Sequence, residues 1–367
     1  MATTMSAINA TLNATEAPYQ ALCAAGHDPA PSPIPTGVRI FLGVLLSIID
    51  LAVILGNLLV VIAILKFEQL RSKITNYFIV SLAISDMCVG VFVLPFAAIQ
   101  DLLGNWPFGH YCLTWVSFDV MMSTASILNL LMIAVERYIA VTRPFHYHEI
   151  VTNKTAGIML GVAWIASGMV SFIPLQLEWF YFEGDYRWHQ WATDQALGPL
   201  CKLAFNPYYA IISSSISFYV PLIMMTFLYG RVFAIARRQA KQIADMDKAM
   251  ANVRKDGKGT KRSENKATKT MATVMGVFIL CWLPFFILNC LLGWDPEMLL
   301  CKLNPNFMDI FSFFVWLGWI NSVFNPFIYS LNPSFRAAYR KILCRCCGKG
   351  QSRARGYYED YTVSTVG

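Results

Sequence analysis

Seven long apolar stretches, separated by short polar segments, dominate the pattern of the chain. They cover about residues 40–65, 75–103, 109–142, 155–177, 208–234, 268–292 and 307–331. Each is long enough, at about 20 residues or more, to cross a hydrocarbon core of roughly 30 Å as a helix. None shows the strict alternation of apolar and polar positions that membrane β-strands require. The pattern therefore predicts an all-α membrane protein built as a bundle of seven transmembrane helices.

The composition agrees with a membrane protein and excludes two other classes. Of the 367 residues, 56% are hydrophobic and only 14% are charged, and the mean hydropathy is +0.49. Soluble domains carry about 25% charged residues, and disordered chains are poor in apolar and aromatic residues. We predict an outer tail, a seven-helix domain, a short amphipathic helix (Pro333–Leu343) that leads into cysteines, and an inner tail, which cover residues 1–39, 40–331, 332–347 and 348–367.

Positive charge is distributed unevenly between the two sides of the predicted bundle. If the N-terminus is outside, all but four of the 29 Lys and Arg residues lie inside, the four being Arg39, Arg187, Lys202 and Lys302. Cytoplasmic loops of membrane proteins carry this excess of Lys and Arg. We therefore predict a multi-pass protein of the plasma membrane with an extracellular N-terminus and a cytoplasmic C-terminus. The net charge of +7 then reflects topology and contact with membrane lipid, and no nucleic acid is predicted as a partner.

Four cysteines lie at the outer ends of the predicted spans or in the loops that join them. Cys112 opens the third stretch, and Cys201 lies in the long segment between the fourth and fifth stretches. The exterior is oxidising, so we expect these two to form a disulfide that ties the outer loop across the mouth of the bundle. Cys290 and Cys301 flank the last outer loop, and their pairing stays open at this point.

Two other covalent modifications are predicted, one on each side of the membrane. The sequons Asn9-Ala-Thr and Asn13-Ala-Thr lie on the outer tail, where glycosylation takes place. Three cysteines follow the short amphipathic stretch on the inner side without partners at zinc spacing, which favours palmitoylation over metal binding. They are Cys344, Cys346 and Cys347.

Two carboxylates stand out among the polar residues within the predicted spans. Asp119 lies about two turns below Cys112, and Asp86 lies near the middle of the second span. Most of the neighbouring Ser and Asn residues are readily explained as hydrogen bonds between helices. An ionisable group in hydrocarbon is costly, and no Lys or Arg within the spans lies near either acid. Each carboxylate therefore needs a cation from elsewhere.

The sequence argues against three other functions of membrane proteins. A retinal protein needs a lysine in the last span, and residues 307–331 contain none. Internal repeats or charge rings, typical of transporters and channels, are not found. An enzyme needs a nucleophile with a base, and all five histidines lie at membrane edges: His27, His110, His146, His148 and His189. No enzyme activity is predicted.

Short motifs occur in order along all seven spans. They are Gly56-Asn57, Leu82–Asp86, Glu136-Arg137-Tyr138, Trp164, Pro221 with Tyr229, Cys281-Trp282-Leu283-Pro284, and Asn325-Pro326-Phe327-Ile328-Tyr329. Together with Cys112 and Cys201, this set resembles the rhodopsin-class G-protein-coupled receptors over about residues 40–347. The resemblance implies a receptor that responds to an extracellular ligand.

Four further segments resemble one aminergic subgroup, the type-1 dopamine receptors that raise cyclic AMP. They are Phe118–Asn129, Ser213–Tyr219, Cys281–Cys290 and Val315–Trp319. Adrenergic receptors share the Asp and the serines but have Asn in place of Val315 and Tyr in place of Trp319. The resemblance implies a dopamine receptor that activates adenylate cyclase through a stimulatory G protein. The alternative is a receptor for another biogenic amine: octopamine, noradrenaline or serotonin.

The residues at the implied ligand site suit a catecholamine. A protonated amine would supply the cation that Asp119 lacks, in a charge-assisted pair. Serine hydroxyls in the fifth span can exchange hydrogen bonds with two adjacent phenol oxygens, and aromatic rings can enclose the catechol. The expected ligand-binding residues are Asp119, Ser123, Ser213, Ser214, Ser217, Trp282, Phe285, Phe286, Asn289, Val315 and Trp319.

The resemblance also implies residues that change contacts on activation and a site for a sodium ion. The activation residues are Glu136, Arg137, Tyr138, Tyr229, Glu264, Phe278, Pro284, Pro326 and Tyr329. The expected sodium site, which favours the inactive state, consists of Asp86, Ser126, Asn321 and Asn325. Apart from an allosteric sodium ion, no cofactor or metal is predicted.

The segment Ala240–Ser263 is expected to be a short, disordered inner loop. A short loop here resembles receptors coupled to a stimulatory G protein. The other implied partners are arrestin and receptor kinases.

Overall fold

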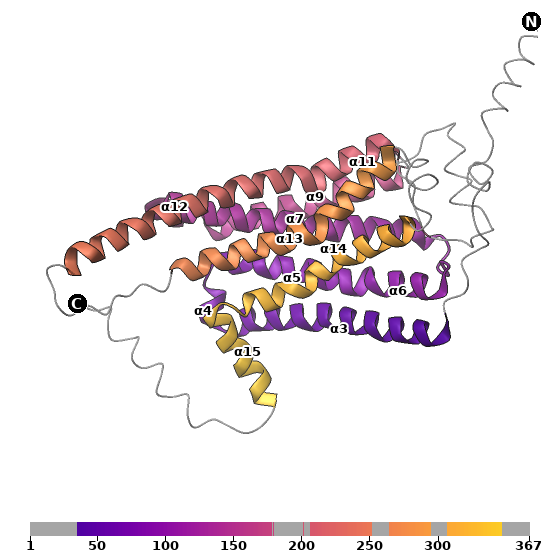
Figure 1. Cartoon of the computed structure of the whole chain (residues 1–367), viewed down its shortest axis with the longest axis horizontal. Helices are drawn as coiled ribbons and strands as arrows, with labels where there is room; N and C mark the ends of the chain where they lie inside the picture. The colour runs from indigo at the N-terminus through magenta and orange to yellow at the C-terminus, as the bar shows by residue number, and fades with distance from the viewer. Residues whose placement is uncertain are drawn as a thin grey trace, which may run out of the picture.

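The computed structural model describes residues 35–177, 179, 201, 206–251, 264–294 and 307–346. Within these ranges, the side chains of residues 240, 243–251, 264–272, 308, 345 and 346 are not described. Seven helices in this part of the chain are long and apolar enough to cross a membrane, and they lie side by side in Figure 1. Their bounds are Thr36–Lys66, Thr75–Leu103, Tyr111–Thr142, Asn153–Gln176, Pro207–Gln239, Thr273–Trp294 and Asp309–Tyr329. The predicted fold class is confirmed.

The helical elements follow one another without strands in the described residues. In chain order they are α3 (Thr36–Lys66), α4 (Glu68–Arg71), α5 (Thr75–Phe92), α6 (Leu94–Leu103), α7 (Tyr111–Thr142), η1 (Pro144–His146), α8 (Tyr147–Ile150), α9 (Asn153–Gln176), α11 (Pro207–Ser214), η3 (Ser215–Tyr219), α12 (Val220–Ala251), α13 (Glu264–Trp294), α14 (Phe307–Tyr329) and α15 (Pro333–Cys346). The second span therefore consists of α5 and α6, and the fifth of α11, η3 and the first part of α12.

The prediction of a disordered inner loop over Ala240–Ser263 was wrong for the first half of that segment. Helix α12 continues as far as Ala251 and extends beyond the rest of the bundle in Figure 1. Residues such as Ala, Arg, Gln, Lys and Met, which fill this stretch, are strong helix formers even where no packing supports them. Residues 252–263 lie outside the described part of the chain, and α13 begins at Glu264.

Two spans are interrupted where they border the centre of the bundle. Between α5 and α6, Val93 departs from the ideal helical φ, with φ −117°, two residues before Pro95. Proline removes a backbone donor and crowds the preceding turn, which accounts for the break. In the fifth span, Ser215–Tyr219 forms a π-helical segment. Such segments insert an extra residue into a turn and re-aim the side chains around it.

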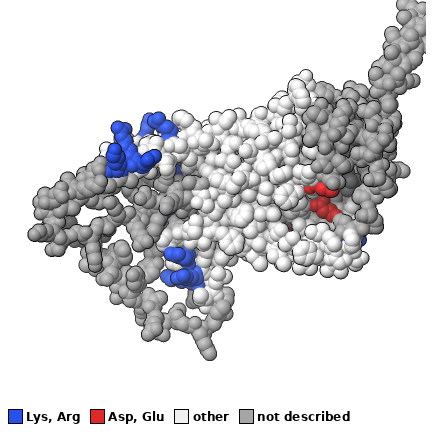
Figure 2. All heavy atoms as spheres, viewed as in Figure 1, with Lys and Arg blue, Asp and Glu red and all other residues white. Residues whose placement is uncertain are grey.

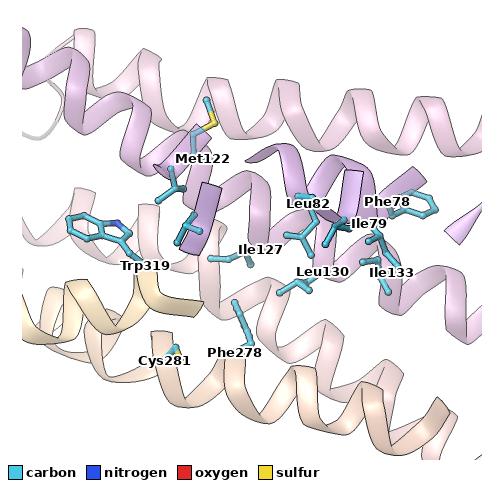
Figure 3. Close-up of a cluster of buried hydrophobic side chains, with 14 of the residues drawn as sticks. Phe78, Ile79, Leu82, Met122, Ile127, Leu130, Ile133, Phe278, Cys281 and Trp319 are labelled. Carbon is cyan, nitrogen blue, oxygen red and sulfur yellow. The ribbon is translucent and has the colours of Figure 1, made fainter. Parts of the chain in front are cut away.

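Helix α7 lies at the centre of the bundle, where it packs against α5, α9 and α12. Figure 3 shows Phe278 of α13 pointing toward Ile127 and Leu130 of α7, and all three side chains are almost fully buried. The outward faces carry exposed apolar residues instead, such as Phe41 and Leu55 of α3. A surface of this kind faces lipid rather than water.

Charged residues gather at the two ends of the bundle, leaving an uncharged band between them (Figure 2). Exposed basic residues at one end include Arg238 and Lys241 of α12 and Arg340 of α15. Exposed acids at the other end include Asp101 of α6 and Asp309 of α14. The structure thus separates the charges as the positive-inside pattern predicts.

Helix α15 turns away from the bundle beyond α14 (Figure 1). Its buried residues Phe335, Ala338 and Tyr339 face the bundle, and the ammonium of Lys341 lies 5.7 Å from the ring centre of Phe67. The thiol of Cys344 is free and exposed. Cys347 and the side chain of Cys346 lie outside the described residues, as do Asn9 and Asn13.

Candidate functional site

A cavity of about 220 Å³ opens between α6, α7, α11, α13 and α14. It is enclosed mostly by apolar and aromatic side chains, with a few polar groups that converge on it, as small-molecule sites usually are. All eleven residues expected at the ligand site line it: Asp119, Ser123, Ser213, Ser214, Ser217, Trp282, Phe285, Phe286, Asn289, Val315 and Trp319. Sequence reasoning missed the residues nearer its outer end, among them Gln100, Asp101 and Phe311.

Asp119 supplies an anionic oxygen to this cavity. Its Oδ1 accepts a hydrogen bond from the indole Nε1 of Trp319 at 2.8 Å and one from the hydroxyl of Ser123 at 3.3 Å. No donor reaches its Oδ2 within the described residues, and no Lys, Arg or His belongs to the cavity lining. Neutral donors orient a carboxylate without cancelling its charge. The free oxygen is therefore a binding point for a cation.

Hydroxyl groups on the π-helical side of the cavity lie opposite this acid. The hydroxyl of Ser217 accepts from Thr124 at 3.1 Å, and that of Ser214 accepts from the amide of Asn289 at 3.1 Å. Each of these serines keeps its own O–H for a ligand. The O–H of Ser213 instead donates to the backbone carbonyl of Tyr209 at 2.6 Å, so that Ser213 can only accept. The three serines are thus chemically different.

Aromatic side chains form the floor of the cavity. The ring of Phe286 stacks on that of Phe218 at 4.3 Å between centroids, and Trp282 meets Phe285 edge-on at 5.9 Å. Trp282 in turn lies directly against Gly318 of α14, because a Cβ at that position would stand 2.8 Å from the indole ring. A glycine is needed there to let the indole occupy this place.

The structure confirms the predicted disulfide between Cys112 and Cys201, with a Cα–Cα distance of 5.4 Å. Cys201 is 5% exposed and lines the cavity. Cys290 forms no disulfide within the described part of the chain. Its possible partner Cys301 lies outside the described residues.

Below the cavity, Asp86 receives three hydrogen bonds from neutral groups. Ser126 and Ser322 donate to Oδ1 at 2.9 and 2.8 Å, and Asn325 donates to Oδ2 at 2.7 Å. Asn321 was expected here, but its neighbour Ser322 donates instead. Asn321 and Ser322 are four and three residues from Asn325, so either could share its helix face, and the packing of α14 brings Ser322 to the acid. Asn321 is nevertheless buried.

At the inner end, Glu136 and Arg137 form an ion pair at 2.7 Å. Two residues that sequence reasoning missed complete the cluster. The hydroxyl of Thr75 donates to Glu136 at 2.9 Å and accepts from Arg137, and the phenol of Tyr147 donates to Glu136 at 2.5 Å. Burial, followed by the adjacent carboxylate, raises the pKa of Tyr147 to about 12. The phenol therefore stays a donor at neutral pH.

The other expected activation residues are distributed along the bundle. Phe278 is fully buried beneath Trp282, Pro284 and Pro326 lie inside α13 and α14, and Tyr329 stacks on Phe335 at 5.7 Å. Tyr138 and Tyr229 are half-buried on α7 and α12. The side chain of Glu264 lies outside the described residues.

Comparison with known proteins identifies the family. Residues 56–329 match the family described as 7 transmembrane receptor (rhodopsin family), and the chain belongs to this family of receptors, which are not enzymes. It is 41% identical to the D(1A) dopamine receptor of Xenopus laevis over 332 residues, 83% of this chain and 72% of that protein. It is also 41% identical to the D(1) dopamine receptor of Carassius auratus, with 83% and 88% covered. The D(5)-like dopamine receptor of Takifugu rubripes is 42% identical, with 85% and 69% covered.

The contact between Trp282 and Gly318 can be tested by adding one methyl group. We expect Gly318→Ala to lower both the thermal stability of the purified receptor and its affinity for an amine, since overpacking costs about 1–3 kcal/mol. Gly161→Ala on α9 is the matched control, because nothing lies within 4 Å of a Cβ there. Equal melting temperatures and affinities for the two variants would contradict this account of the floor.

Proposed function

We propose that this chain is a receptor for dopamine that activates adenylate cyclase through a stimulatory G protein. The observation that carries the proposal is the free Oδ2 of Asp119, which faces an apolar cavity whose opposite wall holds the hydroxyls of Ser214 and Ser217. The relatives at about 41% identity are named as D(1) and D(5)-like dopamine receptors, which supports the same ligand.

Dopamine matches the two polar ends of this cavity. Its ammonium would bind Oδ2 of Asp119, and its two adjacent phenol groups would meet Ser214 and Ser217, which each have an O–H to donate. Phe285 and Phe286 would contact the ring between these ends. A ligand with a charge at one end and two hydroxyls at the other satisfies both walls at once.

The cavity also favours dopamine over noradrenaline, which carries an additional hydroxyl near its ammonium. Val315 lines the cavity one turn before Trp319 on α14, close to the acid that Trp319 contacts. An isopropyl group offers no partner to that hydroxyl, and a polar group that loses water without a new hydrogen bond weakens binding.

Coupling to a G protein is supported by the inner end of the bundle. Phe145, in the connection between α7 and α9, is 95% exposed, which leaves its ring available to a protein partner. Tyr147 in the same connection donates to Glu136 near the inner end of α7. We expect α13 to move outward about Pro284 on activation and to open a groove for a G-protein helix.

The remaining assignments follow the charge separation of the bundle. We propose a plasma-membrane location with the N-terminus outside, where Asn9 and Asn13 would be glycosylated. The basic end would face the cytoplasm, where lipid, arrestin and receptor kinases would meet it. Palmitoylation is proposed at Cys344, Cys346 and Cys347, the first of which is exposed.

The pairing of the amine with Asp119 is tested by cyclic AMP in cells that express the chain. Dopamine should raise cyclic AMP at lower doses than noradrenaline, octopamine, tyramine or serotonin. Asp119→Asn should reduce its potency about 30-fold or more, because losing one partner of a desolvated charge pair costs about 2–5 kcal/mol. Asp309→Asn removes an exposed acid outside the cavity and should change nothing. A response that survives Asp119→Asn would refute the proposal.

Because the serine hydroxyls of the fifth span make different hydrogen bonds, single substitutions should affect dopamine binding unequally. Ser214→Ala and Ser217→Ala should each weaken dopamine binding about 5- to 30-fold, since each removes one hydrogen bond of about 1–2 kcal/mol. Ser215→Ala is the matched control, because that hydroxyl donates to the carbonyl of Ile211 and does not line the cavity. If Ser215→Ala weakened binding as much as the other two, the assignment of the serines would be wrong.

We also propose that the Asp86 cluster binds a sodium ion that favours the inactive state. The residues fit, because a buried carboxylate without a basic partner and several hydroxyl and amide oxygens suit a hard cation. Sodium chloride should weaken dopamine binding several-fold relative to choline chloride at equal ionic strength. Asp86→Asn should abolish this difference. A sodium effect of the same size in the variant would exclude the site.

A further inference from the structure

The outer end of α6 is bonded to two different walls of the cavity through adjacent residues. Oε1 of Gln100 accepts a hydrogen bond from the backbone N–H of Cys201 at 2.8 Å. The next residue, Asp101, accepts one from the indole Nε1 of Trp316 on α14 at 2.7 Å. One helix end thus joins the segment tied to α7 by the disulfide and the helix that carries the partner of Asp119.

The position of these two residues follows from the break in the second span. Pro95 lies in the first turn of α6, and Ala97, Gln100 and Asp101, at i, i+3 and i+4, present one face to the cavity. Gly104, at φ 69°, adopts the left-handed conformation that ends the helix directly after this face. The local sequence therefore determines where α6 begins and where it ends.

The two bonds differ in their surroundings. Gln100 and Cys201 are 7% and 5% exposed, so loss of the acceptor would leave a buried N–H without a partner. Asp101 is exposed and Trp316 half-buried, but Trp316 is in turn in contact with residues deeper in the cavity. Trp316 meets Trp319 edge-on at 5.1 Å, and Trp319 donates to Asp119. The outer end of α6 is therefore linked to Asp119, through Trp316 and Trp319, as well as to Cys201.

We propose that Gln100 and Asp101 are positioning residues that hold the mouth of the cavity closed over a bound amine. They would set how fast the amine associates and dissociates without being its principal contacts. The proposal rests on the amine site proposed above. Breaking either bond should let the walls separate more often, which accelerates passage in both directions. Loss of a ligand contact, in contrast, would accelerate dissociation alone.

The test measures association and dissociation of a tritiated amine antagonist of dopamine receptors on membranes that contain the full chain. Gln100→Met keeps the length of the side chain without its acceptor, and Gln100→Glu keeps an acceptor oxygen. We expect Gln100→Met to raise both rate constants about three- to tenfold, with a much smaller change in Kd. Gln100→Glu should stay near the original rates. Gln176→Met is the control, because Gln176 bonds to Ser117 outside the cavity.

The bond between Asp101 and Trp316 provides an independent test if Gln100→Met fails to reach the membrane. Asp101→Leu and Trp316→Phe should each raise both rate constants, and the double variant should add nothing to the larger single effect. Asp101→Asn keeps an acceptor and should behave as the original chain, as should Asp309→Asn.

Three results would overturn the inference. Unchanged rates in Gln100→Met or Asp101→Leu, with antagonist binding intact, would refute it and leave the proposed function standing. A rise in dissociation without a rise in association would make these residues ligand contacts instead. If the unaltered chain, shown to be at the cell surface, bound no amine at all, both the inference and the proposed function would fail.

Discussion

The structure depends on one constraint: a carboxylate inside an apolar bundle must be stabilised, and here only neutral groups do so. Asp119 receives an indole and a hydroxyl, and Asp86 receives two hydroxyls and an amide. Such hydrogen bonds lower the cost of burying the acid but leave its negative charge in place. Under the proposed function, a mobile cation completes the balance in each case, an amine at Asp119 and a sodium ion at Asp86. Ligand recognition is thus a consequence of how the bundle solves a stability problem.

Helix α14 connects these two acids. Trp319, Ser322 and Asn325 follow one another at intervals of three residues, so they lie along one face of the helix. The first donates to Asp119 and the other two to Asp86. The carbonyl of Ser322 also accepts from Asn57 of α3. Any ligand that shifts Trp319 therefore acts on the rigid element that carries the donors of the lower acid, and a cation at the lower acid acts on the upper one in return.

The sequence was sufficient for the parts of the site that depend on helix type and face. Apolar runs predicted the spans, and residues such as Ser214 and Asn289 reached the cavity because their helices turn that face inward. The sequence was insufficient where a small rotation of a helix about its axis determines which of two adjacent residues reaches the site. Asn321 and Ser322 are both polar neighbours, and only the packing of α14 selects Ser322. The bond between Gln100 and Cys201 joins residues 101 apart in the chain, and no local pattern predicts such a pair. Helix α12 ran past its expected end because helix propensity outweighed the polar composition.

Polar bonds and aromatic rings both hold the bundle together. Polar bonds join elements at the ends, at Gln100 and Asp101 outside and at Glu136 inside, and in the middle, at Asp86. The contact between η3 and α13 consists instead of aromatic rings, chiefly Phe218, Phe278 and Phe286. Aromatic contacts have a broad range of favourable geometries, so these rings can slide against one another at little cost, whereas the polar bonds break outright. A ligand that displaces Phe286 can therefore move α13 as a body through this layer. Only a ligand that binds the open arrangement more tightly than the closed one can supply the free energy of this movement.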